Sequence, residues 1–254
     1  MMAFAIGCLV GAMIGLTGLG GGVLMTPVLI VFLGLPAAQG VGTALLVSAL
    51  VKLSAGVLYL RRGQVSFPVL GWMLAGGLPG AALGAGGLEH LQSAGRNGLV
   101  MTVLGAIILV YTGLELAQAG RRNGTRLAAP GSLLAWLSLP IGASVGFSSA
   151  GSGALGTLLL LRCTRLTPVQ VVGTDILFGL ALAAVGGGIH LATGLFDRNL
   201  LIQLLAGGLL GGIAGAQLAH RLPMSMLRKW LLAFLVLIGA VLLYKGVVAL
   251  WAGA

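Results

Sequence analysis

Apolar residues are gathered into eight long blocks, which are separated by short segments rich in glycine, proline or arginine. The blocks cover residues 3–34, 43–60, 67–88, 97–119, 131–161, 171–193, 199–219 and 229–252. Apolar runs of about 20 residues are typical of helices that cross a bilayer, whereas the strands of an outer-membrane barrel alternate over about 10 residues. The pattern therefore predicts an all-α integral membrane protein surrounded by lipid.

Two of the blocks, 3–34 and 131–161, are too long for a single crossing. A continuous helix of that length would measure about 45–50 Å, whereas the hydrocarbon core is about 30 Å thick. Both blocks are interrupted by glycine, at residues 18–22 in the first and 151–153 in the second. Each is therefore expected to be either one broken, tilted span or a hairpin that returns to the side it entered.

The two long blocks belong to an internal repeat. A shift of 131 residues aligns 11–63 with 142–194 without a gap, and 17 of the 53 pairs are identical. The matched positions include Gly11, Gly15, Gly20, Gly22, Gly42, Thr43, Gly56 and Gly63 with Gly142, Gly146, Gly151, Gly153, Gly173, Thr174, Gly187 and Gly194. The repeat predicts two homologous halves, 1–127 and 128–254, which is the usual build of secondary transporters.

Composition agrees with a membrane protein and changes how the charge is interpreted. The chain is 58% apolar and 7% charged, with a mean hydropathy of +1.11, whereas soluble domains are about 25% charged. The net charge of +10 would suggest nucleic acid in a soluble protein, but here the basic residues lie in short loops between apolar blocks. We therefore expect no nucleic-acid partner and use the basic residues to predict orientation.

The distribution of basic residues distinguishes the two topologies. If all eight blocks cross, Arg61, Arg62, Arg121, Arg122, Arg126 and Arg198 face Arg96, Arg162, Arg165, Arg221, Arg228 and Lys229, six against six. If the two broken blocks return, ten basic residues share one side and only Arg96, Arg198 and Lys245 lie opposite. The second arrangement fits the positive-inside rule. It predicts inverted repeats, each a glycine-broken hairpin followed by three transmembrane helices, with both termini on the outer side.

The glycine breaks are candidate anion sites. A new helix is expected near Val23 and near Ala154, and the first N–H groups of a helix lack partners and carry the positive end of its dipole. The alternative is that the glycines only let helices pack closely. The predicted substrate-binding residues are Thr17, Gly18, Gly20, Gly21, Gly22, Thr43, Ser48, Lys52, Ser148, Ser149, Gly151, Ser152, Gly153 and Thr174.

Two charged residues within apolar blocks are candidates for function, because a charge at membrane depth is costly. Lys52 is predicted to contact an anionic substrate or Asp175, or to connect two helices. Asp175 is predicted to bind a coupling proton or sodium ion. Thr43 and Thr174 are also candidates for helix N-caps. Asp175 and Glu115 are the only acids expected within spans, too few for a hydrolytic enzyme.

Metal and cofactor sites are not expected. The chain has three histidines at unrelated positions, and its two cysteines, Cys8 and Cys163, lie far apart in the sequence. Neither set has the spacing of metal ligands or of a disulfide framework.

Several motifs are similar to those of one transporter family. Residues 15–27, followed by Leu35-Pro36 and Val41-Gly42-Thr43, resemble the first signature of the sulfite exporter TauE/SafE family, also called the toluenesulfonate uptake permease family. The second half resembles the second signature through Gly146, Gly151, Ser152, Gly153, Pro168, Gly173 and Thr174. It departs from that signature at Ser152, which replaces a glycine, and at Thr157-Leu158, which replaces a Thr-Pro pair.

The resemblance implies a multi-pass transporter of the prokaryotic cytoplasmic (inner) membrane. Its substrate would be a small sulfur-containing anion, such as sulfite, sulfoacetate or an aromatic sulfonate, moved inward or outward. The alternatives are an anion channel, a transporter of another small organic anion, and a membrane-embedded enzyme or assembly subunit.

Overall fold

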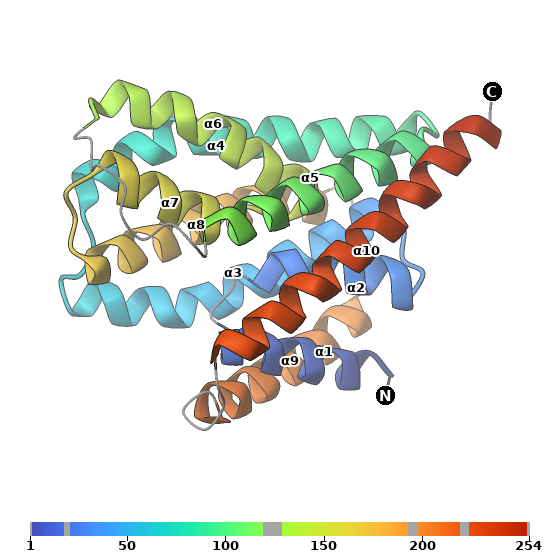
Figure 1. Ribbon diagram of the computed structural model, residues 1–254, viewed down its shortest axis with the longest axis horizontal. Coiled ribbons are helices and arrows are strands. Elements are labelled where there is room, and N and C mark those ends of the chain that lie inside the picture. Colours follow the sequence, from blue (N-terminus) through green and yellow to red (C-terminus); the bar gives the residue numbers. More distant parts are fainter. Residues whose placement is uncertain (1, 18–20, 119–128, 193–197, 219–223, 253–254) are drawn as a thin grey trace.

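A computed structural model describes residues 2–17, 21–118, 129–192, 198–218 and 224–252. All regular secondary structure in these ranges is helical. The helices are α1 Met2–Thr17, α2 Gly21–Phe32, α3 Ala37–Arg61, α4 Phe67–Ser93, α5 Asn97–Gln118, α6 Gly131–Ser148, α7 Ala154–Cys163, α8 Pro168–Ala192, α9 Arg198–Leu218 and α10 Met224–Ala252. The helices form a bundle in which most axes run along its length (Figure 1).

Within the described ranges, six helices are long and apolar enough to cross a membrane. They are α3, α4, α5, α6, α8 and α10. The shorter apolar helices are Ala3–Met13, Gly22–Phe32, Ala154–Cys163 and Asn199–Gly215. The chain is thus a multi-pass α-helical membrane protein, as the hydropathy pattern predicted. Five of the six coincide with blocks that were expected to cross. The sixth is α6, which has 18 residues; it takes the place of α9, whose described apolar part is shorter.

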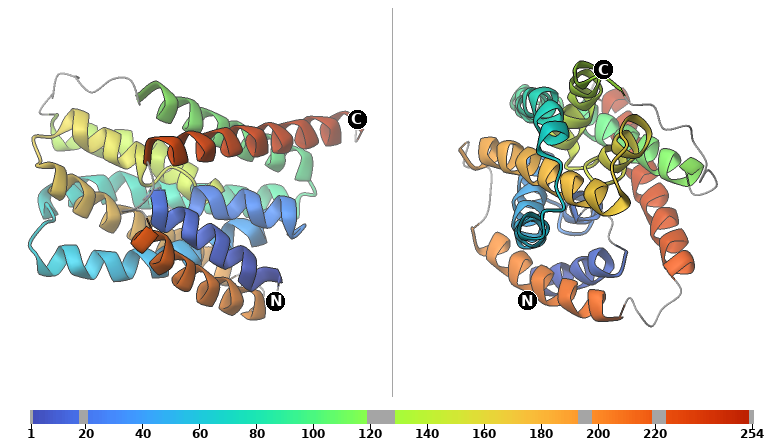
Figure 2. Two further views of the ribbon diagram at one scale, coloured as in Figure 1. Left: turned by 60° about the horizontal axis from the view of Figure 1, so that its bottom comes forward. Right: turned by 90° about the vertical axis from the view of Figure 1, so that its left-hand side faces the viewer.

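Each of the two overlong blocks contains two helices. The first holds α1 and α2, and the second holds α6 and α7. Within each pair, the two helices run in opposite directions along the long axis (Figures 1 and 2). Between α6 and α7, Ser149, Gly151 and Gly153 have φ angles of 57°, 117° and 118°. L-residues with side chains rarely adopt such angles, so the glycines at 151 and 153 permit this change of direction.

The ends of α3 and α8 correct one prediction about the threonines. α3 begins at Ala37, directly after Pro36, and α8 begins at Pro168. Thr43 and Thr174 therefore lie in the second turn of their helices and do not act as N-caps. Proline suits the first turn of a helix because the missing N–H would have no partner there, and this places the helix starts earlier than the apolar blocks suggested.

The closest helix packing relies on glycine. A Cβ atom at Gly76, Gly80 or Gly84 of α4 would meet the carbonyl oxygens of Ala135, Leu139 and Ala143 in α6. A Cβ atom at Gly207, Gly211 or Gly215 of α9 would meet the carbonyl oxygens of Phe4, Cys8 and Ala12 in α1. Every residue of the first set is separated by 131 positions from its counterpart in the second. Small residues give such backbone contact between helices in membranes.

The described arginines are divided between the two ends of the bundle. The α3–α4 connection, next to Arg61 and Arg62, lies at the same end as the α7–α8 connection, which contains Arg165 (Figure 1). The α4–α5 connection, which contains Arg96, lies at the opposite end. The start of α1 and the last turns of α10 also point toward that second end (Figures 1 and 2).

Candidate functional site

Lys52 of α3 contacts the connection between α6 and α7. Its Nζ atom donates a hydrogen bond of 2.6 Å to the Oγ atom of Ser152. Ser152 is buried, and Lys52 is half-buried. The lysine therefore reaches from the first half of the chain to the glycine break of the second half.

Asp175 of α8 lies beside this lysine. Its carboxylate accepts a 2.9 Å hydrogen bond from the Thr157 hydroxyl, and it interacts electrostatically with the Lys52 ammonium group. The backbone of Gly153 also faces the carboxylate. A buried carboxylate needs such partners, because an isolated charge is costly away from water. Asp175 is thereby joined both to the first turn of α7 and to Lys52.

Two glycines provide the space for this cluster. A Cβ atom at Gly179, one turn after Asp175 on α8, would collide with the Nζ atom of Lys52 and lie 3.0 Å from Ser152 Oγ. A Cβ atom at Gly156 of α7 would collide with Oδ1 of Asp175. No hydrogen bond to this Oδ1 comes from the described part of the chain. The cluster therefore depends on small residues as well as on charged ones.

The start of α2 contacts the α6–α7 connection. Ser149 Oγ lies 2.5 Å from Thr26 Oγ1 and donates a 2.8 Å hydrogen bond to the carbonyl oxygen of Gly22. A Cβ atom at Gly22 would collide with the carbonyl oxygen of Ser149. The start of α2 is thus in contact with the α6–α7 connection through residues 22, 26 and 149.

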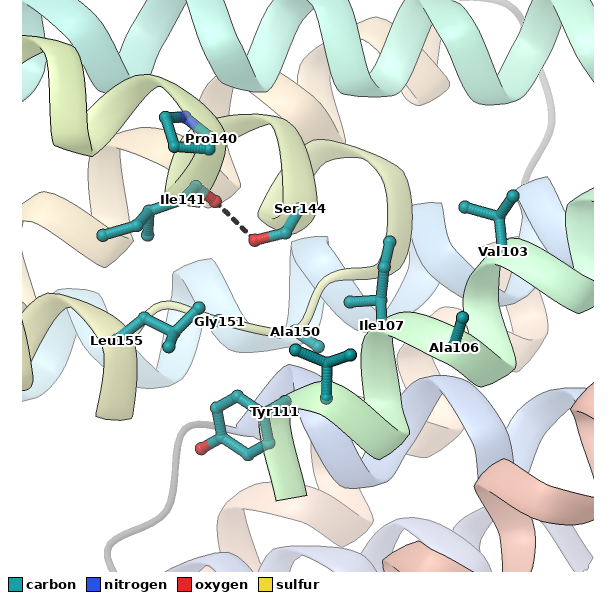
Figure 3. Close-up of a pocket in the computed structure, with 11 residues that line it drawn as sticks. Val103, Ala106, Ile107, Tyr111, Pro140, Ile141, Ser144, Ala150, Gly151 and Leu155 are labelled. Atoms are coloured by element: carbon teal, nitrogen blue, oxygen red, sulfur yellow. Dashed lines mark hydrogen bonds between the residues drawn. The ribbon is translucent and has the colours of Figure 1, made fainter. Parts of the chain in front are cut away.

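An apolar cavity lies on another side of the same connection. Its volume is about 380 Å³, and it lies between α5, α6 and residues 150–155 (Figure 3). Ala150, Gly151 and Leu155 line it together with Ile107 and Ile141. The Ser144 hydroxyl, also in the wall, donates to the carbonyl oxygen of Ile141. The cavity wall has few polar groups, so it offers little to bind a charged ligand.

The remaining predicted serines and threonines have other surroundings. Ser148 Oγ donates to the Ser144 carbonyl and accepts from Ala150 N, so it stabilises the end of α6. Thr174 Oγ1 accepts a 3.0 Å hydrogen bond from Ser66 N, which joins the α3–α4 connection to α8.

Thr43 and Ser48 are both buried in α3, and Ser48 lies one turn before Lys52. The Thr43 hydroxyl has no hydrogen-bond partner within the described ranges.

Part of the predicted first-half site is outside the structural description. Gly18 and Gly20 are not among the described residues. Thr17 and Gly21 are described only as the last residue of α1 and the first of α2. The structure therefore places Gly22 alone of the predicted first-half glycines.

One ionisable pair within the bundle was not predicted from the sequence. His190 of α8 and Glu89 of α4 lie 3.1 Å apart, Nδ1 to Oε1, with 1% and 18% of their side chains exposed. The expectation that only Asp175 and Glu115 are acids within spans was wrong, because α4 continues to Ser93 and includes Glu89. The sequence feature that could have indicated this pair is Glu89 itself, which lies directly after the apolar block 67–88.

The described residues contain no group of three His, Cys, Asp or Glu side chains arranged to hold a metal ion. The chemistry available at the cluster is therefore that of one ammonium group, one carboxylate, hydroxyl groups and backbone N–H groups at the start of α7. These groups are suited to hold an oxyanion and a proton.

Comparison with known proteins gives consistent results along the chain. The family described as "Sulfite exporter TauE/SafE" matches residues 3–242. The chain is 30% identical over 225 residues to the "Probable membrane transporter protein YjnA" of Bacillus subtilis, covering 85% of this chain and 88% of that protein. It is 26% identical to the "Probable membrane transporter protein YdhB" of the same organism, covering 96% and 100%. A "Probable membrane transporter protein" of Xylella fastidiosa is 28% identical, covering 86% and 84%. No solved structure matches.

Proposed function

Because the chain belongs to the sulfite exporter TauE/SafE family of membrane transporters, we propose that it is a secondary transporter of a small sulfur-containing anion, either sulfite or an organosulfonate. The observation that carries this proposal is the hydrogen bond between Lys52 and Ser152 beside Asp175. It joins a cation within a span to a helix start at a glycine break. Those are the two features by which transporters bind anions at membrane depth.

The anion would bind between Lys52 and the first turn of α7. The lysine ammonium group has three donors, of which one is directed at Ser152 and others remain for substrate oxygens. The Ser152 hydroxyl and the N-terminal end of α7 add donors. Asp175 balances the lysine charge in the empty site. If Asp175 binds a proton or exchanges its interaction with Lys52 for a sodium ion, the site becomes more attractive to an anion, which would couple the two.

We further propose that the halves 1–127 and 128–254 are inverted repeats that move against each other. The opposite directions within the α1–α2 and α6–α7 pairs support the hairpin form of this proposal. The equivalent glycine contacts of α4 with α6 and of α9 with α1 support the symmetry. Alternating access would then result from rocking one half about the site between them.

The same proposal includes orientation in the cytoplasmic membrane. The end with the α3–α4 and α7–α8 connections, rich in arginine, would face the cytoplasm, and the termini would face outward. The lipid would cover the large apolar side chains exposed around the bundle, such as Leu83, Val110 and Leu237.

Ligand binding by purified protein is the direct test of substrate class. We expect one sulfur-containing compound, out of sulfite, sulfate, sulfoacetate, an aromatic sulfonate and the zwitterion taurine, to raise the melting temperature more than matched carboxylates do. Ser152→Ala should reduce that increase, because it removes a hydroxyl beside Lys52. Ser132→Ala is the matched control, since Ser132 is exposed on α6. A panel without any stabilising member, combined with no flux into proteoliposomes, would refute the proposed substrate class.

Gly179→Ala is expected to weaken anion binding while leaving the protein folded. The new methyl group would collide with Lys52 Nζ, which is the end of a flexible side chain, and would lie 3.0 Å from Ser152 Oγ. The lysine must then leave its position beside Ser152. Gly188→Ala is the control on the same helix, because nothing lies within 4 Å of that Cβ position. An anion-induced melting shift that is equal in the two variants would show that the Lys52–Ser152 geometry is not needed for binding.

A further inference from the structure

His190 and Glu89 form a second buried ionisable pair, separate from the Lys52 cluster. Nδ1 of His190 and Oε1 of Glu89 are 3.1 Å apart, and the histidine is 1% exposed. Glu89 belongs to α4 in the first half, and His190 belongs to α8 in the second half. The pair therefore connects the two halves at a point where a change of charge would alter their attraction.

Among the described residues around the imidazole, Glu89 is the acidic side chain that contacts it. The backbone of Gly146 in α6 faces the ring, and α6 has no titratable side chain. Gly42 of α3 lies on another side, where a Cβ atom would be 2.7 Å from His190 Cβ. The titratable groups of α3 (Lys52, Tyr59 and Arg61) lie more than two turns beyond Gly42, and those of α4 and α8 are Glu89, exposed His90 and Asp175.

The internal repeat shows that the packing at this position does not require histidine. The counterpart of His190 is Tyr59, and the counterpart of Gly42 is Gly173. A Cβ atom at Gly173 would lie 2.9 Å from Tyr59 Cδ1, as one at Gly42 would lie against His190. An aromatic ring against glycine is thus sufficient for the helix contact in the other half. The histidine adds an imidazole that can accept a proton beside the Glu89 carboxylate.

We propose that the His190–Glu89 pair, rather than Asp175, binds the proton that is coupled to anion transport, an inference that rests on the proposed transporter function. One proton from water adds to the imidazole, and the resulting imidazolium forms an ion pair with the Glu89 carboxylate. The protonated pair is neutral, whereas the unprotonated pair has one negative charge. The neutral form holds α4 against α8 more strongly and repels a passing anion less. Release of the proton on the other side of the membrane weakens this contact and resets the halves.

Anion accumulation driven by a pH gradient tests the proposal. With one proton per monovalent anion, a one-unit gradient supports up to about tenfold accumulation in proteoliposomes. We expect His190→Gln and Glu89→Gln to lower this to about onefold, while the anion still raises the melting temperature as in the wild type. His90→Gln is the matched control, because it removes an exposed histidine adjacent to Glu89. His190→Tyr supplies the residue of the repeat counterpart, and so retains a ring if glutamine impairs folding. Gradient-driven accumulation by folded His190→Gln or His190→Tyr protein, equal to wild type, would overturn the proposal.

A second measurement separates failure of the proton site from failure of the transporter proposal. In protein with isotope-labelled histidine, the NMR signal that disappears in His190→Gln belongs to His190. We expect that signal to shift as the imidazole gains a proton on acidification, and to respond differently to pH in Glu89→Gln. An imidazole that keeps one protonation state over the whole pH range in which the protein stays folded would refute the proton site, even if anions bind. A titrating His190 in a protein that binds and moves no anion would refute the proposed function alone.

Discussion

Replacing Lys52 with methionine, or Asp175 with asparagine, should each destabilise the protein strongly, and combining the two changes should restore much of the loss. Each single change leaves one charge without the opposite charge with which it interacts. Breaking a fully buried pair costs about 3–5 kcal/mol, and we expect the lower end of that range because Lys52 is half-buried. The double variant leaves neither charge in place, and neutral replacements of such pairs are often close to neutral in stability. The measurement is the free energy of unfolding in detergent for the three variants, with Arg96→Met, which removes an exposed charge, as the control.

The double variant also separates folding from transport. It should be folded and should show neither an anion-induced melting shift nor carrier flux, because the ammonium group beside Ser152 is absent. We expect flux to fall by at least about 100-fold, equivalent to about 2.7 kcal/mol of lost binding or barrier lowering. If the double variant loses as much stability as the two single variants together, Lys52 and Asp175 do not act as a pair. If Lys52→Met remains folded and binds the anion normally, Lys52 is not part of the site.

The helices were largely predictable because lipid imposes simple rules on sequence. Every backbone group in the membrane must be paired within a helix, so apolar length locates most of the spans, with α6 and α9 as the exceptions. The positions where α1 ends and α7 begins agree with the glycine breaks at residues 18–22 and 151–153. The helix ends were less predictable. α4 continues to Ser93 and includes Glu89, whose buried partner His190 lies about 100 positions away in the sequence.

The candidate site could be predicted only as a set of alternatives. A lysine within a span indicated that it has a partner. The sequence left three possibilities for that partner: an anionic substrate, Asp175, or a polar group on another helix. The hydrogen bond to Ser152 depends on the space that Gly179 leaves on α8, and no periodicity in the sequence indicates that α8 approaches α3 there. The partner of Thr174 was equally unpredictable, because its hydroxyl accepts a hydrogen bond from the backbone N–H of Ser66, which lies in a loop 108 residues earlier.

The packing of the two halves leads to a second large effect. Gly80→Ala and Gly211→Ala should each destabilise the protein by about 1–3 kcal/mol or more, and by similar amounts. In each case the new methyl group would overlap a carbonyl oxygen, Leu139 for the first and Cys8 for the second. A backbone atom within a helix cannot move away as a side chain can, so the helices must separate along their contact, with the strain typical of overpacking.

Two control variants, and a comparison of the losses in Gly80→Ala and Gly211→Ala, test whether the two helix contacts are equivalent. Gly86→Ala in α4 meets nothing within 4 Å, and Gly212→Ala in α9 meets Gly11 O at an ordinary 3.7 Å. Both should be neutral, or more stable by up to about 1 kcal/mol because alanine favours helices. Unfolding free energies of the four variants provide the comparison. Equal losses for Gly80→Ala and Gly211→Ala are expected if α4–α6 and α9–α1 are equivalent contacts of two related halves. A large loss at only one of them would mean that the halves have diverged in how they pack, and that a symmetric rocking motion is the wrong mechanism.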